Sequence, residues 1–122
     1  MKNVLLAVGP LMCAVAVLAG AFGAHGLKTR LDPAALDLWE TASRYLMYGG
    51  LGVILVGLLG SVGGHRGVSW AGWLLVTGAI VFSGTVGALA VGAPRWLGAV
   101  TPIGGLMMII GFLVCAWFAC RL

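Results

Sequence analysis

Four long apolar runs divide the chain, and polar or glycine-rich segments separate them. The apolar runs cover residues 4–24, 45–60, 68–91 and 102–120. A run of about 20 apolar residues is long enough to cross a hydrocarbon core of about 30 Å. The pattern therefore predicts a single all-α domain, residues 1–122, which forms an integral membrane four-helix up-and-down bundle. Because the number of spans is even, both termini are expected on the same side of the membrane.

The first run follows Met1-Lys2-Asn3, as the apolar part of a signal peptide would, and Ala19-Gly20-Ala21 has the small residues of a cleavage site. Its length of about 20 residues instead favours a transmembrane helix. Pro10 within this run is expected to bend the helix or to leave one carbonyl without its usual partner.

The segment between the first two runs is the most polar part of the chain, and it holds all three acidic residues, Asp32, Asp37 and Glu40. Asp32 followed by Pro33 is typical of an N-cap and a first-turn proline. Polar residues alternate there with apolar ones such as Trp39 at helical spacing. We expect a short amphipathic helix over residues 33–44, lying at the membrane interface and running on into the second span.

Composition supports the membrane class. Hydrophobic residues make up 61% of the chain and charged residues only 8%, whereas a soluble domain has about 25% charged residues. The formal net charge of +4 comes from basic residues scattered between the apolar runs. Such dispersed charge is typical of membrane-flanking positions and argues against a nucleic-acid partner. The three cysteines lie inside apolar runs without a CxxC spacing, so no metal site is expected.

Up-and-down threading would gather the polar side chains of the spans near one membrane face. This predicted polar cluster, or ligand site, consists of His25, Tyr45, Ser83, Thr85 and Thr101. His25 is a candidate proton relay, ligand or hydrogen-bond anchor, and anchoring is the interpretation we favour. Ser83 and Thr85 are expected to bond to carbonyls of their own helix. Thr101 precedes a proline and is expected to cap the fourth span. No catalytic residues and no cofactor are predicted.

Small residues recur along the apolar runs, as they do where transmembrane helices pack closely. The positions expected to mediate helix packing are Gly20, Gly23, Gly49, Gly84, Gly87, Gly104 and Gly105. Packing within the bundle is the simpler explanation, and docking of an external helix is the alternative.

Several of these motifs together resemble the DUF423 family of small bacterial inner-membrane proteins, which are related to the transmembrane protein 256-like group. The motifs are Gly20-Ala21-Phe22-Gly23-Ala24-His25, Trp39 with Thr41-Ala42 and Tyr45, Phe82-Ser83-Gly84, and Thr101-Pro102-Ile103-Gly104-Gly105. The resemblance implies four spans with cytoplasmic termini, and it implies no established activity.

The resemblance also implies polar or bulky side chains that this chain lacks. It implies a histidine where Gly49 stands, a glutamine at Leu46 and a tyrosine at Gly87. These exchanges would leave room beside the second and third spans for a lipid, a pigment, a quinone or a partner helix.

We therefore expect a non-enzymatic accessory or stabilising subunit of a larger membrane complex, in contact with membrane lipid and with protein partners or further copies of itself. One alternative is a small oligomeric transporter or channel with a polar site around His25, and another is a lipid- or quinone-binding membrane protein. The bacterial inner membrane is the expected location. Basic residues are nearly balanced between the two sides, and we expect the termini in the cytoplasm.

Overall fold

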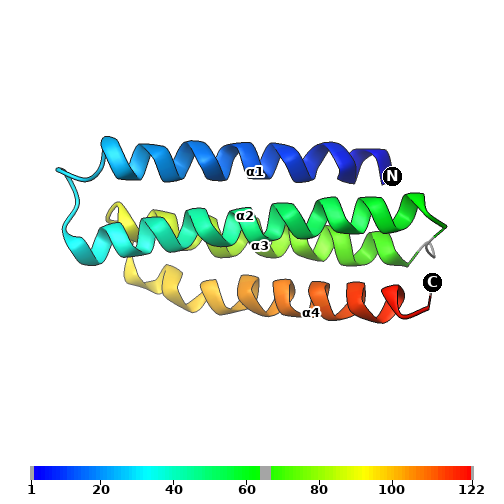
Figure 1. The fold of residues 1–122 in the computed structure, drawn as a ribbon. Helices are drawn as coiled ribbons and strands as arrows, with labels where there is room; N and C mark the ends of the chain where they lie inside the picture. The colour runs from blue at the N-terminus through cyan, green and yellow to red at the C-terminus, as the bar shows by residue number, and fades with distance from the viewer. Residues whose placement is uncertain (1, 64–66, 122) are drawn as a thin grey trace.

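The computed structural model describes residues 2–63 and 67–121, and four long helices account for most of them (Figure 1). They are α1 (Lys2–His25), α2 (Pro33–Ser61), α3 (Val68–Ala90) and α4 (Thr101–Ala119), and a short 3₁₀ helix, η1 (Arg95–Ala99), precedes α4. All four long helices are long and apolar enough to cross a membrane. The predicted all-α, four-span membrane fold is confirmed. The expected glycine-rich loop around His65 and Arg66 lies partly outside the described residues.

The predicted amphipathic helix does run on into the second span, but a helix lying in the membrane interface is not shown among the described residues. Residues 33–44 form the first turns of α2, which continues without a break to Ser61. The start is as predicted, because Asp32 is the N-cap and its Oδ1 accepts a hydrogen bond of 2.8 Å from the backbone N–H of Ala35. After Pro33, no glycine or proline occurs before Gly49 to end the helix.

The length of α2 explains its charged first part. Its 29 residues extend over about 43 Å, which exceeds a hydrocarbon core of about 30 Å by roughly nine residues. Asp37 and Glu40 fall within or next to that excess, and both are exposed. By contrast, α1 runs through Pro10 as one helix.

The helices pack in sequence order around a central pair. α2 packs along α3, α1 packs against α2, and α4 packs against α3 on the opposite side (Figure 1). Within residues 2–63 and 67–121, the backbones of α1 and α4 do not approach each other. The bundle is therefore open between its first and last helices, and both termini lie at the same end (Figure 1).

Glycines bring neighbouring helices into close contact. A Cβ atom on Gly50 of α2 would lie 3.0 Å from the carbonyl oxygen of Gly9 in α1. A Cβ atom on Gly104 of α4 would lie 2.8 Å from the carbonyl oxygen of Gly78 in α3 and 2.5 Å from the amide nitrogen of Phe82. Lipid supplies no hydrophobic force between helices, so such close backbone approach provides much of the packing energy.

The tightest part of the interior lies towards the terminal end of the bundle. Leu5, Val53, Val56 and Leu75 are each less than 2% exposed there. In the opposite half α1 contacts α3 only sparsely, and the space between these two helices stays open.

Candidate functional site

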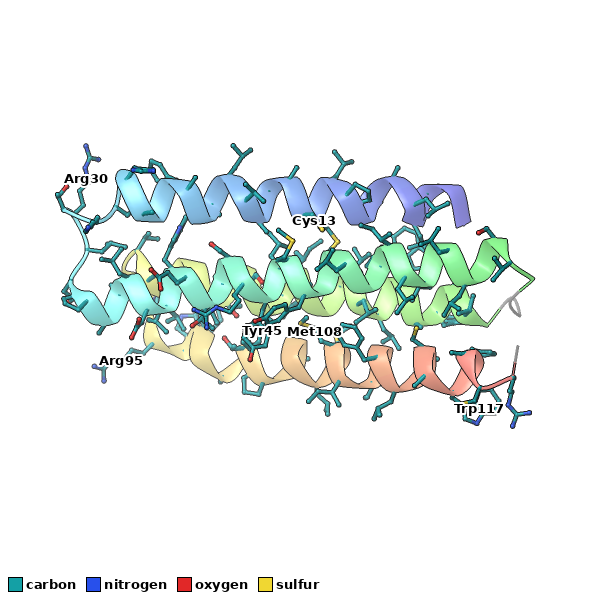
Figure 2. The ribbon with its side chains drawn as sticks, viewed as in Figure 1. Cys13, Arg30, Tyr45, Arg95, Met108 and Trp117 are labelled. Carbon is teal, nitrogen blue, oxygen red and sulfur yellow. The ribbon has the colours of Figure 1, made fainter. Side chains whose placement is uncertain are left out.

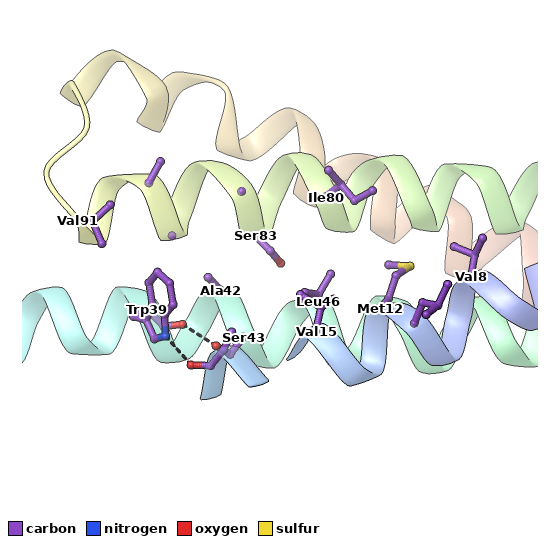
Figure 3. A pocket seen from close by; sticks show the side chains of 15 residues that line it. Val8, Met12, Val15, Trp39, Ala42, Ser43, Leu46, Ile80, Ser83 and Val91 are labelled. Atoms are coloured by element: carbon purple, nitrogen blue, oxygen red, sulfur yellow. Dashed lines mark hydrogen bonds between the residues drawn. The ribbon is translucent and has the colours of Figure 1, made fainter. Parts of the chain in front are cut away.

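A groove lies between α1 and α3. It has a volume of about 550 Å³, and α2 forms its floor (Figure 3). Its lining is almost wholly apolar and comes from three helices: Val8, Leu11, Met12, Val15 and Ala19 of α1; Trp39, Ala42, Ser43 and Leu46 of α2; and Ile80, Ser83, Gly84, Gly87 and Ala88 of α3 with its C-cap residue Val91. No charged side chain lines this groove, so it suits an uncharged, apolar occupant.

Trp39 connects α2 to α1 at the end of the groove nearest the α1–α2 loop. Its indole N–H donates a hydrogen bond of 2.7 Å to the carbonyl oxygen of Ala19. The ring fits only because residue 23 is glycine, since a Cβ there would lie 2.5 Å from the indole. Phe22 meets the ring edge-to-face, with 6.3 Å between centroids. The far edge of the indole comes within 3.9 Å of the Cβ position on Gly87 of α3.

Two serines line the groove, and their hydroxyl groups differ in one respect. Ser43 on α2 is 9% exposed, and its hydroxyl donates a hydrogen bond of 3.1 Å to the carbonyl oxygen of Trp39. Ser83 on α3 is 8% exposed, and its buried Oγ has no hydrogen-bond partner. Figure 3 shows the Ser83 side chain extending from α3 into the space between the helices.

The five residues of the predicted polar cluster do not form one site. Thr85 and Thr101 meet across α3 and α4, with 2.6 Å between their hydroxyl oxygens. Ser83 lies on the groove side of α3, because residues two apart on a helix point about 200° away from each other. Thr85 also donates to its own helix, 2.8 Å from the carbonyl oxygen of Val81.

Tyr45 and His25 lie apart from the groove. The Tyr45 ring packs against Phe82 with 4.8 Å between centroids, and it is also near Tyr48. His25 is exposed at the end of α1 and makes no hydrogen bond within the described residues. Thr101 was expected to be an N-cap, but it is the first residue of α4, and the N-cap position is Val100 without a side-chain bond. The Thr101 hydroxyl lies 3.3 Å from the carbonyl oxygen of Leu97 instead.

Comparison with known proteins identifies the family. Residues 19–105 match the family described as "Protein of unknown function (DUF423)". The chain belongs to the DUF423 family. It is also 47% identical over 112 residues to a UPF0382 membrane protein of Staphylococcus epidermidis, and the match covers 92% of this chain and 91% of the relative. UPF0382 membrane proteins of Staphylococcus saprophyticus and Staphylococcus aureus are 43% and 42% identical, with coverage of 92% and 87% of this chain and 92% and 86% of the relatives. No solved structure matches.

In this DUF423 protein, the glycines singled out from the sequence have different surroundings. Gly20 faces Ser43 of α2 with 4.0 Å from its Cβ position to the serine Cβ, and Gly23 lies beneath Trp39. Gly104 is at the closest α3–α4 crossing, and Gly105 lies against the Phe82 ring. Gly84 has open space where a Cβ would be.

The two exchanges from histidine and tyrosine to glycine have different consequences. At Gly49 a Cβ would lie 2.5 Å from the Cβ of Ala79, so α3 itself occupies the space and no room is left for a ligand. The expectation of empty space at Gly49 is therefore wrong, because the small residue lets the two helices approach. Gly87 does line the groove, and its Cβ position is 3.7 Å from Ala42 and 3.9 Å from Trp39.

Charged groups lie at the ends of the DUF423 bundle. Arg30 and Arg95 are at the end that carries the α1–α2 and α3–α4 connections, and Trp117 is at the terminal end (Figure 2). Arg121 lies over the Trp117 ring, 3.9 Å from its centroid. No group of three or more His, Cys, Asp or Glu side chains suited to a metal ion occurs in the described ranges.

Sequence reasoning missed the groove and the Trp39–Ala19 hydrogen bond. Trp39 was assigned to the interface by its residue type, and a carbonyl oxygen in a neighbouring helix leaves no signal in a sequence. Gly23 was the available clue, since a glycine inside a helix often marks the close approach of a large side chain.

Proposed function

We propose that this DUF423 protein is a small non-enzymatic accessory subunit that stabilises a larger membrane complex by helix packing. The segments that connect the long helices, residues 26–32, 62–67 and 91–100, are short. Most of the surface available for binding a partner therefore lies within the membrane-spanning helices.

One observation supports this proposal above the others: α1 and α4 are the open edges of the bundle. α4 buries a single stripe, which consists of Gly104, Met108, Gly111 and Cys115. The rest of the helix is exposed, including Ile109 at 58% and Leu113 at 65%. A closed bundle would cover part of this surface with α1. We propose that a transmembrane helix of a larger membrane protein covers it instead.

The placement of the polar residues disfavours the transporter or channel alternative. A path around His25 would need Tyr45 and Ser83 along the same passage. His25 instead lies exposed at the end of α1, Tyr45 packs against Phe82, and only Ser83 lines the groove. Transport pathways also commonly carry ionisable groups inside the membrane, and no such group lines the groove.

Site-specific photo-crosslinking tests the accessory role. A benzoylphenylalanine at Ile109 on the open face of α4 is expected to capture one membrane protein in intact cells. The control position is Leu51, which is 54% exposed on the central helix α2. The same partner should be absent from the control, and deletion of the DUF423 protein should lower the amount of that partner in the membrane. Crosslinks that yield only lipid adducts or only homodimers would overturn the proposal.

We also propose that the protein resides in the bacterial inner membrane with both termini in the cytoplasm. Basic residues lie at both ends of the bundle, so the cytoplasmic placement of the termini rests on the family resemblance. A carboxy-terminal fusion to green fluorescent protein should then fluoresce, and a fusion to alkaline phosphatase should be inactive. A dark green fluorescent protein fusion and an active alkaline phosphatase fusion would place the termini on the outer side of the membrane and overturn this orientation.

A further inference from the structure

We propose that the groove between α1 and α3 binds a neutral prenylated quinone, and that the hydroxyl of Ser83 donates a hydrogen bond to a ring carbonyl oxygen. This binding site is independent of the proposed partner surface, because the groove and the outer face of α4 lie on opposite sides of α3. Binding alone is proposed, without an electron-transfer step.

The unpartnered hydroxyl of Ser83 is the first argument for a ligand. A serine in a membrane helix usually bonds to a carbonyl of its own helix, as Ser43 does in the same groove. The buried Oγ of Ser83 makes no such bond. An unsatisfied buried hydroxyl costs free energy, and rotation about χ1 would turn it towards a ligand in the groove. A carbonyl oxygen there would satisfy the hydroxyl.

The length and lining of the groove suit an elongated apolar occupant. The lining runs from Val8 to Ala19 along α1 and from Ile80 to Val91 along α3 and its C-cap, a rise of about 16 Å in each case. The side chains along that length are almost all aliphatic. A single apolar tail with a small ring can therefore lie along the groove.

The depth of Ser83 argues for an uncharged head group. The 23 residues of α3 extend over about 34 Å, so each end reaches about 2 Å beyond a core of about 30 Å. Ser83 is seven residues from the end of α3 at Ala90, which places it about 8 Å inside the core. A phosphate carried to that depth without a cationic partner would be strongly disfavoured. A neutral ring carbonyl meets no such penalty.

Trp39 supplies a flat surface near the same place. Its indole lies in the groove lining about one turn from Ser83, at the level of Gly87. Aromatic rings stack favourably in offset or edge-to-face arrangements. A quinone ring could therefore lie against the indole while its tail runs along the aliphatic lining towards Val8 and Met12.

Equilibrium binding to the full chain in lipid nanodiscs tests this inference. The probe is a benzoquinone with a decyl tail, and the control compound is the same tail and ring without carbonyl oxygens. Ser83→Ala is expected to weaken quinone binding by roughly 5- to 30-fold, the usual effect of one lost hydrogen bond in a buried site. The matched control Ser61→Ala, whose hydroxyl lies outside the groove and is bonded to the carbonyl oxygen of Leu58, should bind within twofold of the wild type. Gly84→Leu should abolish binding, because its side chain would project into open space in the groove.

Thermal unfolding of the ligand-free variants keeps the test independent of folding defects. Ser83→Ala should unfold no more easily than the wild type, because it removes a hydroxyl that has no partner. The proposal is overturned if Ser83→Ala binds the quinone as tightly as the wild type, if the compound without carbonyls binds equally well, or if Ser83→Ala is clearly less stable. If the groove held only a phospholipid acyl chain, the compound without carbonyls would bind as well as the quinone.

Discussion

At the residue scale, Trp39 is a side chain that links three helices of the fold. It starts from α2, donates a hydrogen bond to Ala19 of α1, lies over Gly23 and reaches towards Gly87 of α3. A buried indole N–H that lost this acceptor would have few others, because lipid offers none. Trp39 therefore fixes how far α1 can move away from α3.

Trp39→Phe is expected to lower the free energy of unfolding by about 1 kcal/mol, because phenylalanine keeps the ring contacts and removes only the hydrogen bond. Unfolding in mixed micelles with increasing sodium dodecyl sulfate measures the change. Trp96→Phe is the control, since Trp96 is 65% exposed and makes no hydrogen bond among the described residues. An equal loss in both variants would show that the bond to Ala19 contributes nothing specific.

The separation of Ser83 from Thr85 shows what the sequence could and could not reveal about individual polar groups. Residues two positions apart on a helix point about 200° away from each other. The sequence alone therefore excludes a site that Ser83 and Thr85 share on one face of the helix. The partners of each hydroxyl depend on which helices lie on either side of α3. Thr85 has a hydroxyl of α4 within 2.6 Å, whereas Ser83 faces an apolar groove.

At the element scale, the crossing of α3 and α4 depends on the absence of side chains. Gly104 contacts the backbone of α3 at Gly78 and Phe82, and neither of these backbone groups can yield by a rotamer change. Gly84 lies on the opposite side of α3 and has nothing within 4 Å of its Cβ position. Substitutions at Gly104 and Gly84 can therefore be compared directly, since both are glycines in membrane helices and only Gly104 is packed against another backbone.

Gly104→Ala is expected to destabilise the fold by roughly 1–3 kcal/mol, because the added methyl group would separate the two backbones. Gly84→Ala is expected to be neutral or to stabilise by up to about 1 kcal/mol, since alanine favours a helix more than glycine does. The same detergent unfolding titration compares the two variants. A similar effect of both would contradict the close crossing.

The existence of the four long helices was predictable, because run length and apolar character are local properties of the sequence. The start of α2 was also predictable, since Asp32-Pro33 is a local signal that the capping bond confirms. The placement of its first turns was not, because an amphipathic stretch that runs on into an apolar run has the same pattern whether it lies in the interface or extends the span. Thr101 showed the same limit, since its hydroxyl bonds to α3 rather than capping α4.

At the scale of the whole molecule, the groove and the open edge between α1 and α4 have a common origin. Both arise because α1 packs along α2 and only sparsely along α3. The tilt of each helix and its rotation about its own axis decide this arrangement. Hydrophobic periodicity predicts neither of them when a helix is apolar on all sides. Met12 of α1 and Met108 of α4 extend inwards from the two edges, and each ends within 4 Å of the Cβ position on Gly49.

A spin-label distance between α1 and α4 tests the open arrangement. Because Met12 and Met108 both end beside Gly49, labels at their neighbours Leu11 and Ile109 lie at the same membrane depth, and both positions are exposed. A closed bundle would place the two helix axes 8–10 Å apart. Packing on opposite sides of a central pair places them about 16–20 Å apart, from two such spacings.

The labels are introduced into a variant in which Cys13, Cys115 and Cys120 are replaced by alanine, since all three are free thiols. The reference pair is Ile80 and Ile103, on helices that pack directly against each other. The α1–α4 pair should show a distance several ångströms longer than the reference pair. Equal distances would mean that α1 closes onto α4 in the membrane, which would remove the exposed edge on which the accessory role depends.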